Sequence, residues 1–136
     1  MILCIISIFV VGCTDLNKSN TDNKQLNTSK DVTMYISEKS YLLGDKKITI
    51  NIKNNTSEEL YYGEAYEIEY LKNNIWYEVP FTDDASFTDI GIILGPNKTN
   101  THEISLDNIN INLKKGKYRI IKQVGDAMLA AEFKLK

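Results

Sequence analysis

The sequence contains few of the residues that usually carry catalysis. Its 136 residues include two cysteines, Cys4 and Cys13, and a single histidine, His102. Nucleophilic catalysis needs a nucleophile beside a positioned base, and thiolate zinc sites need several cysteines. His102 is expected on an exposed strand edge as an ordinary surface residue. We therefore expect a non-enzymatic protein without a metal centre or cofactor.

The sequence also has no excess of positive charge. The formal net charge is -2, the isoelectric point is about 5.4, and Arg119 is the only arginine. Proteins that bind nucleic acids normally present a strongly basic surface to the phosphate backbone. The charge balance therefore argues against a nucleic-acid partner.

The sequence has no apolar run long enough to span a bilayer. Residues 1–12 are apolar, but as a helix they would extend only roughly 18 Å, against a hydrocarbon core of about 30 Å. Such a run is typical of an export signal, although it has no Lys or Arg before Cys13. It ends in Val10-Val11-Gly12-Cys13, which resembles a bacterial lipobox. We predict a lipoprotein signal peptide over 1–12 and a diacylglyceryl group on Cys13; the alternative is a buried element with Cys13 as a core thiol.

A lipidated Cys13 would place the protein at the extracytoplasmic face of a bacterial, Gram-positive cell membrane, with membrane lipid as its first partner. The two acyl chains of a diacylglyceryl group are sufficient for stable anchoring. Residues 14–31 are almost entirely polar and offer little apolar surface to offset the entropy of ordering. We predict a flexible polar tether over 13–31, with a structured arm as the alternative.

Residues 32–136 show short apolar alternations of period two, separated by turn residues. The clearest strand is Ile48–Ile52, with three isoleucines on one face. A hairpin is predicted over Tyr66–Val79, with Asn73 and Asn74 at the turn, since asparagine tolerates positive φ. In its first strand Tyr66, Ile68 and Tyr70 share one face, and Glu67 and Glu69 share the solvated one.

About seven short strands at spacings near ten residues predict an all-β fold, an immunoglobulin-like β-sandwich. Two structural signatures support this class. Trp76 lies on a mid-chain strand, where such domains bury a tryptophan between the sheets. Gly116 and Tyr118 open a late strand in the pattern of a tyrosine corner, whose hydroxyl bonds back to the upstream backbone.

The domain resembles the bacterial immunoglobulin-like domains of exported lipoproteins and sensor ectodomains in low-GC Gram-positive bacteria. The resemblance covers residues 32–136 and is carried by Ile50-x-Ile52-x-Asn54-Asn55, Tyr62-Gly63-x-x-Tyr66-x-Ile68-Glu69, Trp76-x-x-Val79-Pro80 and Leu113-x-x-Gly116-x-Tyr118-Arg119-Ile120. It implies the fold and a surface location, and it leaves the activity open.

Two surfaces are candidates for function. Tyr61, Tyr62 and Glu64, near Tyr66, Glu67 and Glu69, could form an acidic surface rimmed by aromatic side chains, which interfaces favour. On alternating strands, however, most of these tyrosines are expected in the core.

The second surface is the acidic loop with Asp83, Asp84 and Asp89, which lacks the ligand spacing of an EF-hand. A solvated loop is expected there, with a cation site as the alternative. The leading interpretation is a membrane-anchored interaction domain with a protein or cell-envelope ligand. The alternative is an immunoglobulin-like proteinase inhibitor acting through the 81–94 loop.

Overall fold

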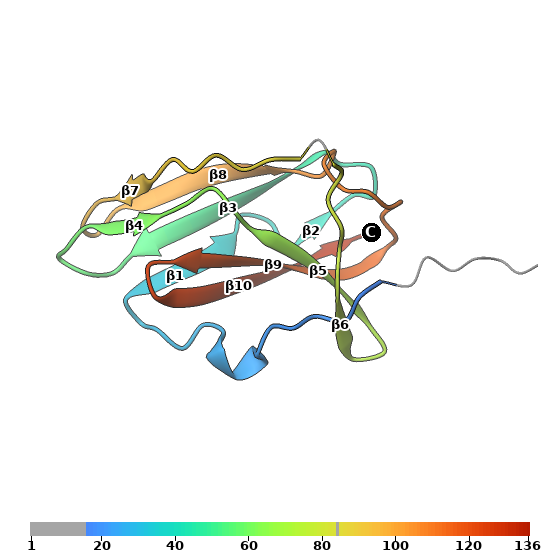
Figure 1. Cartoon of the computed structure of the whole chain (residues 1–136), viewed down its shortest axis with the longest axis horizontal. Helices are drawn as coiled ribbons and strands as arrows, with labels where there is room; N and C mark the ends of the chain where they lie inside the picture. The colour runs from blue at the N-terminus through green and yellow to red at the C-terminus, as the bar shows by residue number, and fades with distance from the viewer. Residues whose placement is uncertain (1–15, 84) are drawn as a thin grey trace, which may run out of the picture.

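The computed structural model describes residues 16–83 and 85–136, which form β-sheets that pack face to face (Figure 1). A three-stranded sheet has the order β1-β3-β8, from Val32–Ile36, Lys47–Asn54 and Thr99–Ser105. A five-stranded sheet has the order β2-β10-β9-β5-β6, from Ser40–Tyr41, Ala127–Leu135, Gly116–Val124, Glu67–Lys72 and Ile75–Glu78. A ribbon pairs β4 (Leu60–Tyr62) with β7 (Ile92–Leu94).

The prediction of an all-β, immunoglobulin-like sandwich is confirmed. Seven of the described strands have four or more residues, and β2, β4 and β7 have two or three. In the described part of the chain the helical content is one 3-10 turn, η1 (Asn23–Gln25). That part contains no helix with the length and apolar character needed to cross a membrane. The signal peptide predicted over 1–12, and Cys13, lie outside the described residues.

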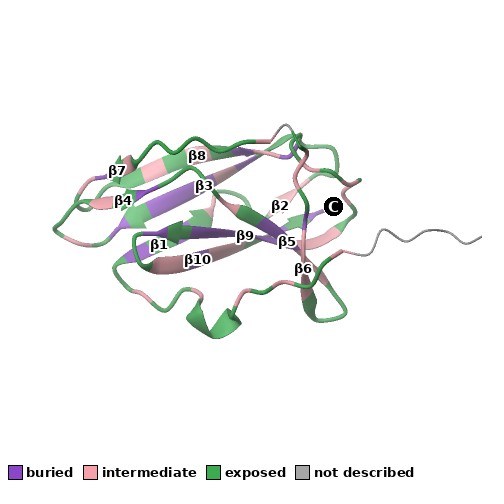
Figure 2. Cartoon of the chain, viewed as in Figure 1, coloured by how far each residue is buried: buried purple, intermediate pink, exposed green. Residues whose placement is uncertain are grey.

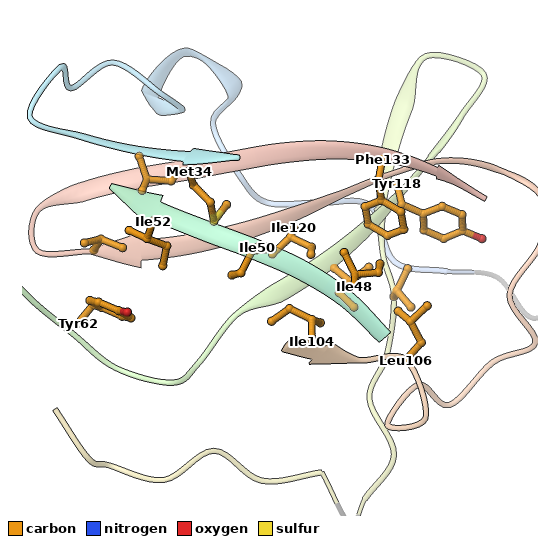
Figure 3. Packing of buried hydrophobic residues seen from close by; sticks show 14 of the residues in the cluster. Met34, Ile48, Ile50, Ile52, Tyr62, Ile104, Leu106, Tyr118, Ile120 and Phe133 are labelled. Carbon is orange, nitrogen blue, oxygen red and sulfur yellow. The ribbon is translucent and has the colours of Figure 1, made fainter. Parts of the chain in front are cut away.

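The core lies between the two large sheets and is centred on β3. Ile48, Ile50 and Ile52 have no exposed surface, as their alternation in the sequence predicts. They face Ile120 of β9 and Phe133 of β10 from the opposite sheet (Figure 3). Buried residues are concentrated on these facing strands (Figure 2). Each fully buried isoleucine contributes about 1.5–3 kcal/mol to stability.

The hairpin predicted over Tyr66–Val79 is present. Strands β5 and β6 pair antiparallel, with Lys72 opposite Ile75. The two residues between them, Asn73 and Asn74, have φ angles of 51° and 61°. Positive φ at both central positions is the backbone of a type I′ turn, whose twist matches that of the paired strands.

The flexible tether predicted over 13–31 is wrong for the residues that the structure describes. Residues 16–31, here called the strap, cross the outer face of the five-stranded sheet from one edge to the other (Figure 1). At β10 the Asn27 N–H donates to the Met128 carbonyl, 2.9 Å. At β6 the Ser19 N–H donates to the Trp76 carbonyl, 2.9 Å, and the Glu78 N–H to the Asn17 carbonyl, 2.8 Å. Free strand edges hold this polar segment through its backbone, without a need for apolar side chains.

Two predictions about the β5–β6 hairpin are corrected by the strap. Trp76 does not pack between the sheets; it is half-buried on the outer face, opposite Leu71 in the register. Glu69 does not point into solvent, since it is completely buried. Both side chains point to the outer face of the five-stranded sheet, as the alternation of their strands predicts. The strap covers this face, which the sequence pattern predicts to be exposed to solvent.

The tyrosine corner is formed at the start of β9. The buried Tyr118 hydroxyl donates to the Lys114 carbonyl, 2.7 Å, and accepts from the Lys114 N–H, 3.1 Å. Gly116, with φ of +150°, lies against Tyr70, and an added Cβ would be 2.9 Å from Tyr70 Cε2. Tyr70 in turn packs on Tyr118, with ring centroids 4.9 Å apart. A side chain at position 116 would therefore push one core ring into another.

We expect Gly116→Ala to lower the free energy of unfolding by about 1–3 kcal/mol, because the new methyl group overpacks the Tyr70–Tyr118 contact. Urea unfolding of the variant measures this loss. Gly91→Ala is the matched control, since an added Cβ there meets nothing within 4 Å. Equal stability of the two variants would contradict the assigned role of Gly116.

Candidate functional site

A groove of about 630 Å³ runs along the start of β5, beside the strap. Leu16 and Asn17 of the strap form one side, and Ile121 of β9 and Met128 of β10 lie at its apolar base. The other side comes from the end of β6 and the loop after it, with Glu78, Val79, Pro80, Phe81 and Phe87. The groove therefore joins segments that are far apart in the sequence.

Three aromatic rings form the rim of this groove. Tyr66 contacts Phe81 and Phe87 edge to face, with ring centroids 5.6 and 4.9 Å apart, and the two phenylalanines are 5.7 Å apart. Phe87 keeps 37% of its surface exposed. Rings held by one another lose little conformational entropy on binding, which makes them effective contacts for a partner.

Two carboxylates, Glu67 and Glu78, line the groove beside these rings. Burial, followed by the negative charges of Glu69 and Glu78, raises the pKa of the Glu67 carboxyl above its ordinary value. The groove thus combines apolar surface with two carboxylates, and Lys122 also belongs to its lining. This combination suits an apolar segment that carries a lysine or arginine side chain.

A buried ion pair supports the strap side of the groove. Arg119 Nε donates to Glu69 Oε2 at 2.5 Å, and both side chains are almost fully buried. The other carboxylate oxygen accepts from the hydroxyls of Ser19 and Thr21, and Arg119 Nη1 donates to Asn23 Oδ1, 2.8 Å. The guanidinium lies 4.2 Å from the centroid of the Trp76 ring. The strap thus provides partners for the second carboxylate oxygen and for Arg119 Nη1, whereas the buried Arg119 Nη2 has no hydrogen-bond partner among the described residues.

A second polar cluster lies inside the sandwich at the edge near β4. Lys122 is 4% exposed, and its ammonium donates to the carbonyls of Gly63, 2.7 Å, and Ala65, 2.9 Å. It lies 5.2 Å from the centroid of the Tyr62 ring, and the Tyr62 hydroxyl is hydrogen-bonded to His102. Lys122 and His102 line a pocket of about 210 Å³ with Glu64 at its edge.

Burial controls the protonation of this cluster. It lowers the pKa of Lys122 to about 8, against a smaller opposing effect of the Glu64 carboxylate. It also lowers the pKa of His102, with a further contribution from the Lys122 charge. Neutral polar groups hold the Lys122 ammonium, and its two hydrogen bonds fix the connection between β4 and β5.

The structure separates the residues proposed from sequence as one interaction surface. Tyr61 is 58% exposed, whereas Tyr62 is a core residue at 5%. Glu64 is exposed and accepts from the Thr88 N–H, 3.1 Å, which ties the 81–94 loop to the β4–β5 connection. Tyr66 and Glu67 lie at the groove, so the aromatic and acidic character predicted for this region is found one strand further along.

The acidic loop does not assemble a metal site among the described residues. Asp83 and Asp89 are exposed, and Asp84 lies outside the described part. Residues 16–83 and 85–136 contain no group of three Asp, Glu, His or Cys side chains placed to hold an ion. His102, expected on the surface, is half-buried.

Sequence reasoning missed Lys122 and the Glu69–Arg119 pair. A signal for Lys122 was available, because it follows Tyr118 and Ile120 at the inward positions of β9. No comparable signal marked Glu69 and Arg119, which lie on the outward positions and are covered by a segment with no apolar pattern.

The family model for the bacterial Ig-like domain matches residues 28–134. The chain belongs to this family. Membership suggests an interaction or surface domain. The matched range begins within the strap, so the bacterial Ig-like domain includes its last residues together with β1 to β9 and all of β10 except Leu135.

Solved structures resemble this bacterial Ig-like domain only in part. An alkylpurine DNA glycosylase, AlkC, of Pseudomonas fluorescens shares 13% identity at a TM-score of 0.44, covering 83% of this chain and 32% of its own. A β-glucosidase of Erythrobacter marinus shares 10% identity at a TM-score of 0.41, and the match covers 76% of this chain and 15% of the enzyme. A β-glucosidase of Listeria innocua shares 17% identity at a TM-score of 0.39, and the match covers 76% of this chain and 16% of the enzyme. The chain spans less than a third of each, and no curated protein matches it.

The lowered pKa of Lys122 predicts a pH-dependent stability. Between pH 8 and the ordinary value of 10.5, the unfolded chain binds a proton that the folded domain does not, so folding is favoured as the pH rises. Relative to Lys122→Met, the wild type should gain about 1–2 kcal/mol between pH 8 and pH 10, after allowance for solvent screening.

Urea unfolding at several pH values measures this difference. The exposed Lys53→Met variant is the control and should show no such trend. A constant difference between wild type and Lys122→Met across this range would contradict the assignment.

Proposed function

We propose that this protein is a non-enzymatic lipoprotein that is anchored to the bacterial membrane through Cys13 and binds a partner in the groove beside β5. The observation that carries the binding role is the groove itself, with an apolar base, a rim of three aromatic rings and two carboxylates. Family membership supports an interaction domain, and the lipobox-like ending of residues 1–13 supports the anchor.

The geometry favours a protein or cell-envelope component that presents an apolar group next to a cation. Ile121 and Met128 offer apolar contact at the base, and Glu67 and Glu78 can pair with a lysine or arginine at the side. Burial, and after it the negative charges of Glu69 and Glu78, raises the pKa of the Glu67 carboxyl, and an approaching cation stabilises the carboxylate against both effects. Binding should therefore weaken as the pH falls and Glu67 becomes protonated.

The anchor is tested by expressing the full chain in a Gram-positive host and separating membranes from soluble protein. We expect the wild type in the membrane fraction, with an intact mass that has lost residues 1–12 and gained a diacylglyceryl group. Cys13→Ser should lose the lipid and the cleavage. Cys4→Ser is the matched control and should behave as the wild type. Wild-type protein that keeps residues 1–12 and carries no diacylglyceryl group would refute the anchor.

The groove is tested by photocrosslinking in the same cells. A benzophenone amino acid replaces Phe87 in the groove or, as a control, the exposed Ile93 of β7. We expect an adduct specific to position 87 that decreases when Glu67→Gln is added. Identical adducts from both positions would exclude the groove as the binding site. Capture of a proteinase that the purified protein also inhibits would favour the inhibitor alternative, since Phe87 lies in the 81–94 loop.

A further inference from the structure

The connection between β2 and β3 forms a rigid tip that presents two leucines. Residues Leu42–Asp45 make a tight turn in which the Asp45 N–H donates to the Leu42 carbonyl, 2.9 Å, and the Leu42 N–H donates to Asp45 Oδ2, 2.8 Å. Gly44 has φ of +106°, which a side chain would oppose. The Leu43 N–H donates to the Lys136 carbonyl, 2.8 Å, and this bond fastens the tip to the end of β10.

The two leucines face solvent in this ordered turn. Leu42 is 66% exposed and Leu43 is 42% exposed. The hydrogen bonds of the turn hold them outward, so they cannot fold back onto the core. Adjacent exposed leucines on a fixed tip are well suited to insert at the boundary between lipid headgroups and acyl chains.

Lysines surround this tip. The Lys134 N–H donates to the Lys39 carbonyl, 2.9 Å, and Lys134 pairs with Lys117 across β9 and β10. Four lysines lie beside the tip in the sequence or through backbone contacts, Lys39, Lys46, Lys134 and Lys136, against two carboxylates, Glu38 and Asp45; Lys117 is paired with Glu132 at 3.6 Å. One carboxylate, that of Asp45, is occupied by the turn itself. This end is therefore basic, although the whole chain has a net charge of -2.

The strap begins at the same end of the molecule as the tip. The described chain begins at Leu16, at the end where β2 and the C-terminus lie (Figure 1). Because residues 16–31 lie on the sheet, only residues 14 and 15 separate Cys13 from Leu16. The chain from position 13 to position 16 can reach at most about 10 Å. A lipid on Cys13 would hold this end close to the headgroups.

We propose that Leu42 and Leu43 insert into an anionic lipid surface while the surrounding lysines contact its phosphate groups. The domain is then docked on the membrane in one orientation, with the β4–β7 ribbon pointing away. This inference rests on the proposed anchor at Cys13. The occupant is a lipid surface rather than a soluble polyanion, because a polyanion would contact the lysines but would leave the two leucines exposed to water.

The test uses the lipidated full chain in vesicles of phosphatidylglycerol and phosphatidylcholine, some with brominated acyl chains that quench tryptophan. In a Trp76→Phe background, Leu42→Trp places the reporter at the tip and Ile93→Trp places it on β7 at the opposite end (Figure 1). We expect quenching of the Leu42→Trp variant to exceed that of Ile93→Trp by about twofold or more. Adding Lys39→Gln, Lys46→Gln and Lys136→Gln, or using phosphatidylcholine alone, should reduce the difference.

Flotation of the vesicles separates the two proposals. Protein that floats with the vesicles but shows equal quenching at both positions would refute the docking and leave the anchor intact. Protein that fails to float would refute the anchor and the docking that rests on it. Unfolding curves of the Leu42→Trp and Ile93→Trp variants should coincide, which ensures that the quenching compares two folded domains.

Discussion

The ion pair between Glu69 and Arg119 is the interaction on which the arrangement of the outer sheet face depends. Removing two charges from water costs several kcal/mol, and this cost is offset only where hydrogen bonds satisfy the remaining polar atoms. Ser19, Thr21 and Asn23 provide most of those bonds from the strap, and Arg119 Nη2 is left buried without a partner in the described part of the chain. The pair therefore holds the strap as much as the strap covers the pair. The position of Leu16 beside the groove follows from this contact.

The groove and the basic tip lie on different strands of the domain. The groove lies where the strap meets β5, β6 and β9, and its aromatic rim comes from the connection after β6. The tip is built on β2, β3 and the last residue of the chain. A domain docked through Leu42 and Leu43, as proposed above, would keep the β4–β7 ribbon away from the lipid, and the strap would link the proposed anchor to the sheet that carries the groove.

The sequence was most informative where one side-chain pattern had one physical meaning. The isoleucines of β3, the Asn73–Asn74 turn and the Tyr118 corner were predictable because inward alternation, positive φ and a fixed loop each leave few alternatives. The strap was not predictable, since it is held by backbone bonds to strand edges and by polar side chains. Trp76 and Glu69 were misplaced for the same reason, because a covered outer face has the same alternation as a solvated one. The first half of β10 was missed because its alanines have a weak strand preference.

The strap also changes what the five-stranded sheet offers to other copies of the chain. An open strand edge carries unpaired N–H and carbonyl groups, and it is a template on which a second polypeptide can add. Asn17 and Ser19 occupy those groups on β6, and Asn27 occupies them on the part of β10 that β2 does not reach. Proteins confined to a surface meet one another far more often than proteins in solution. On the membrane proposed above, a sheet capped by its own chain along β6 and along the first half of β10 would be protected at these edges from pairing with neighbouring copies.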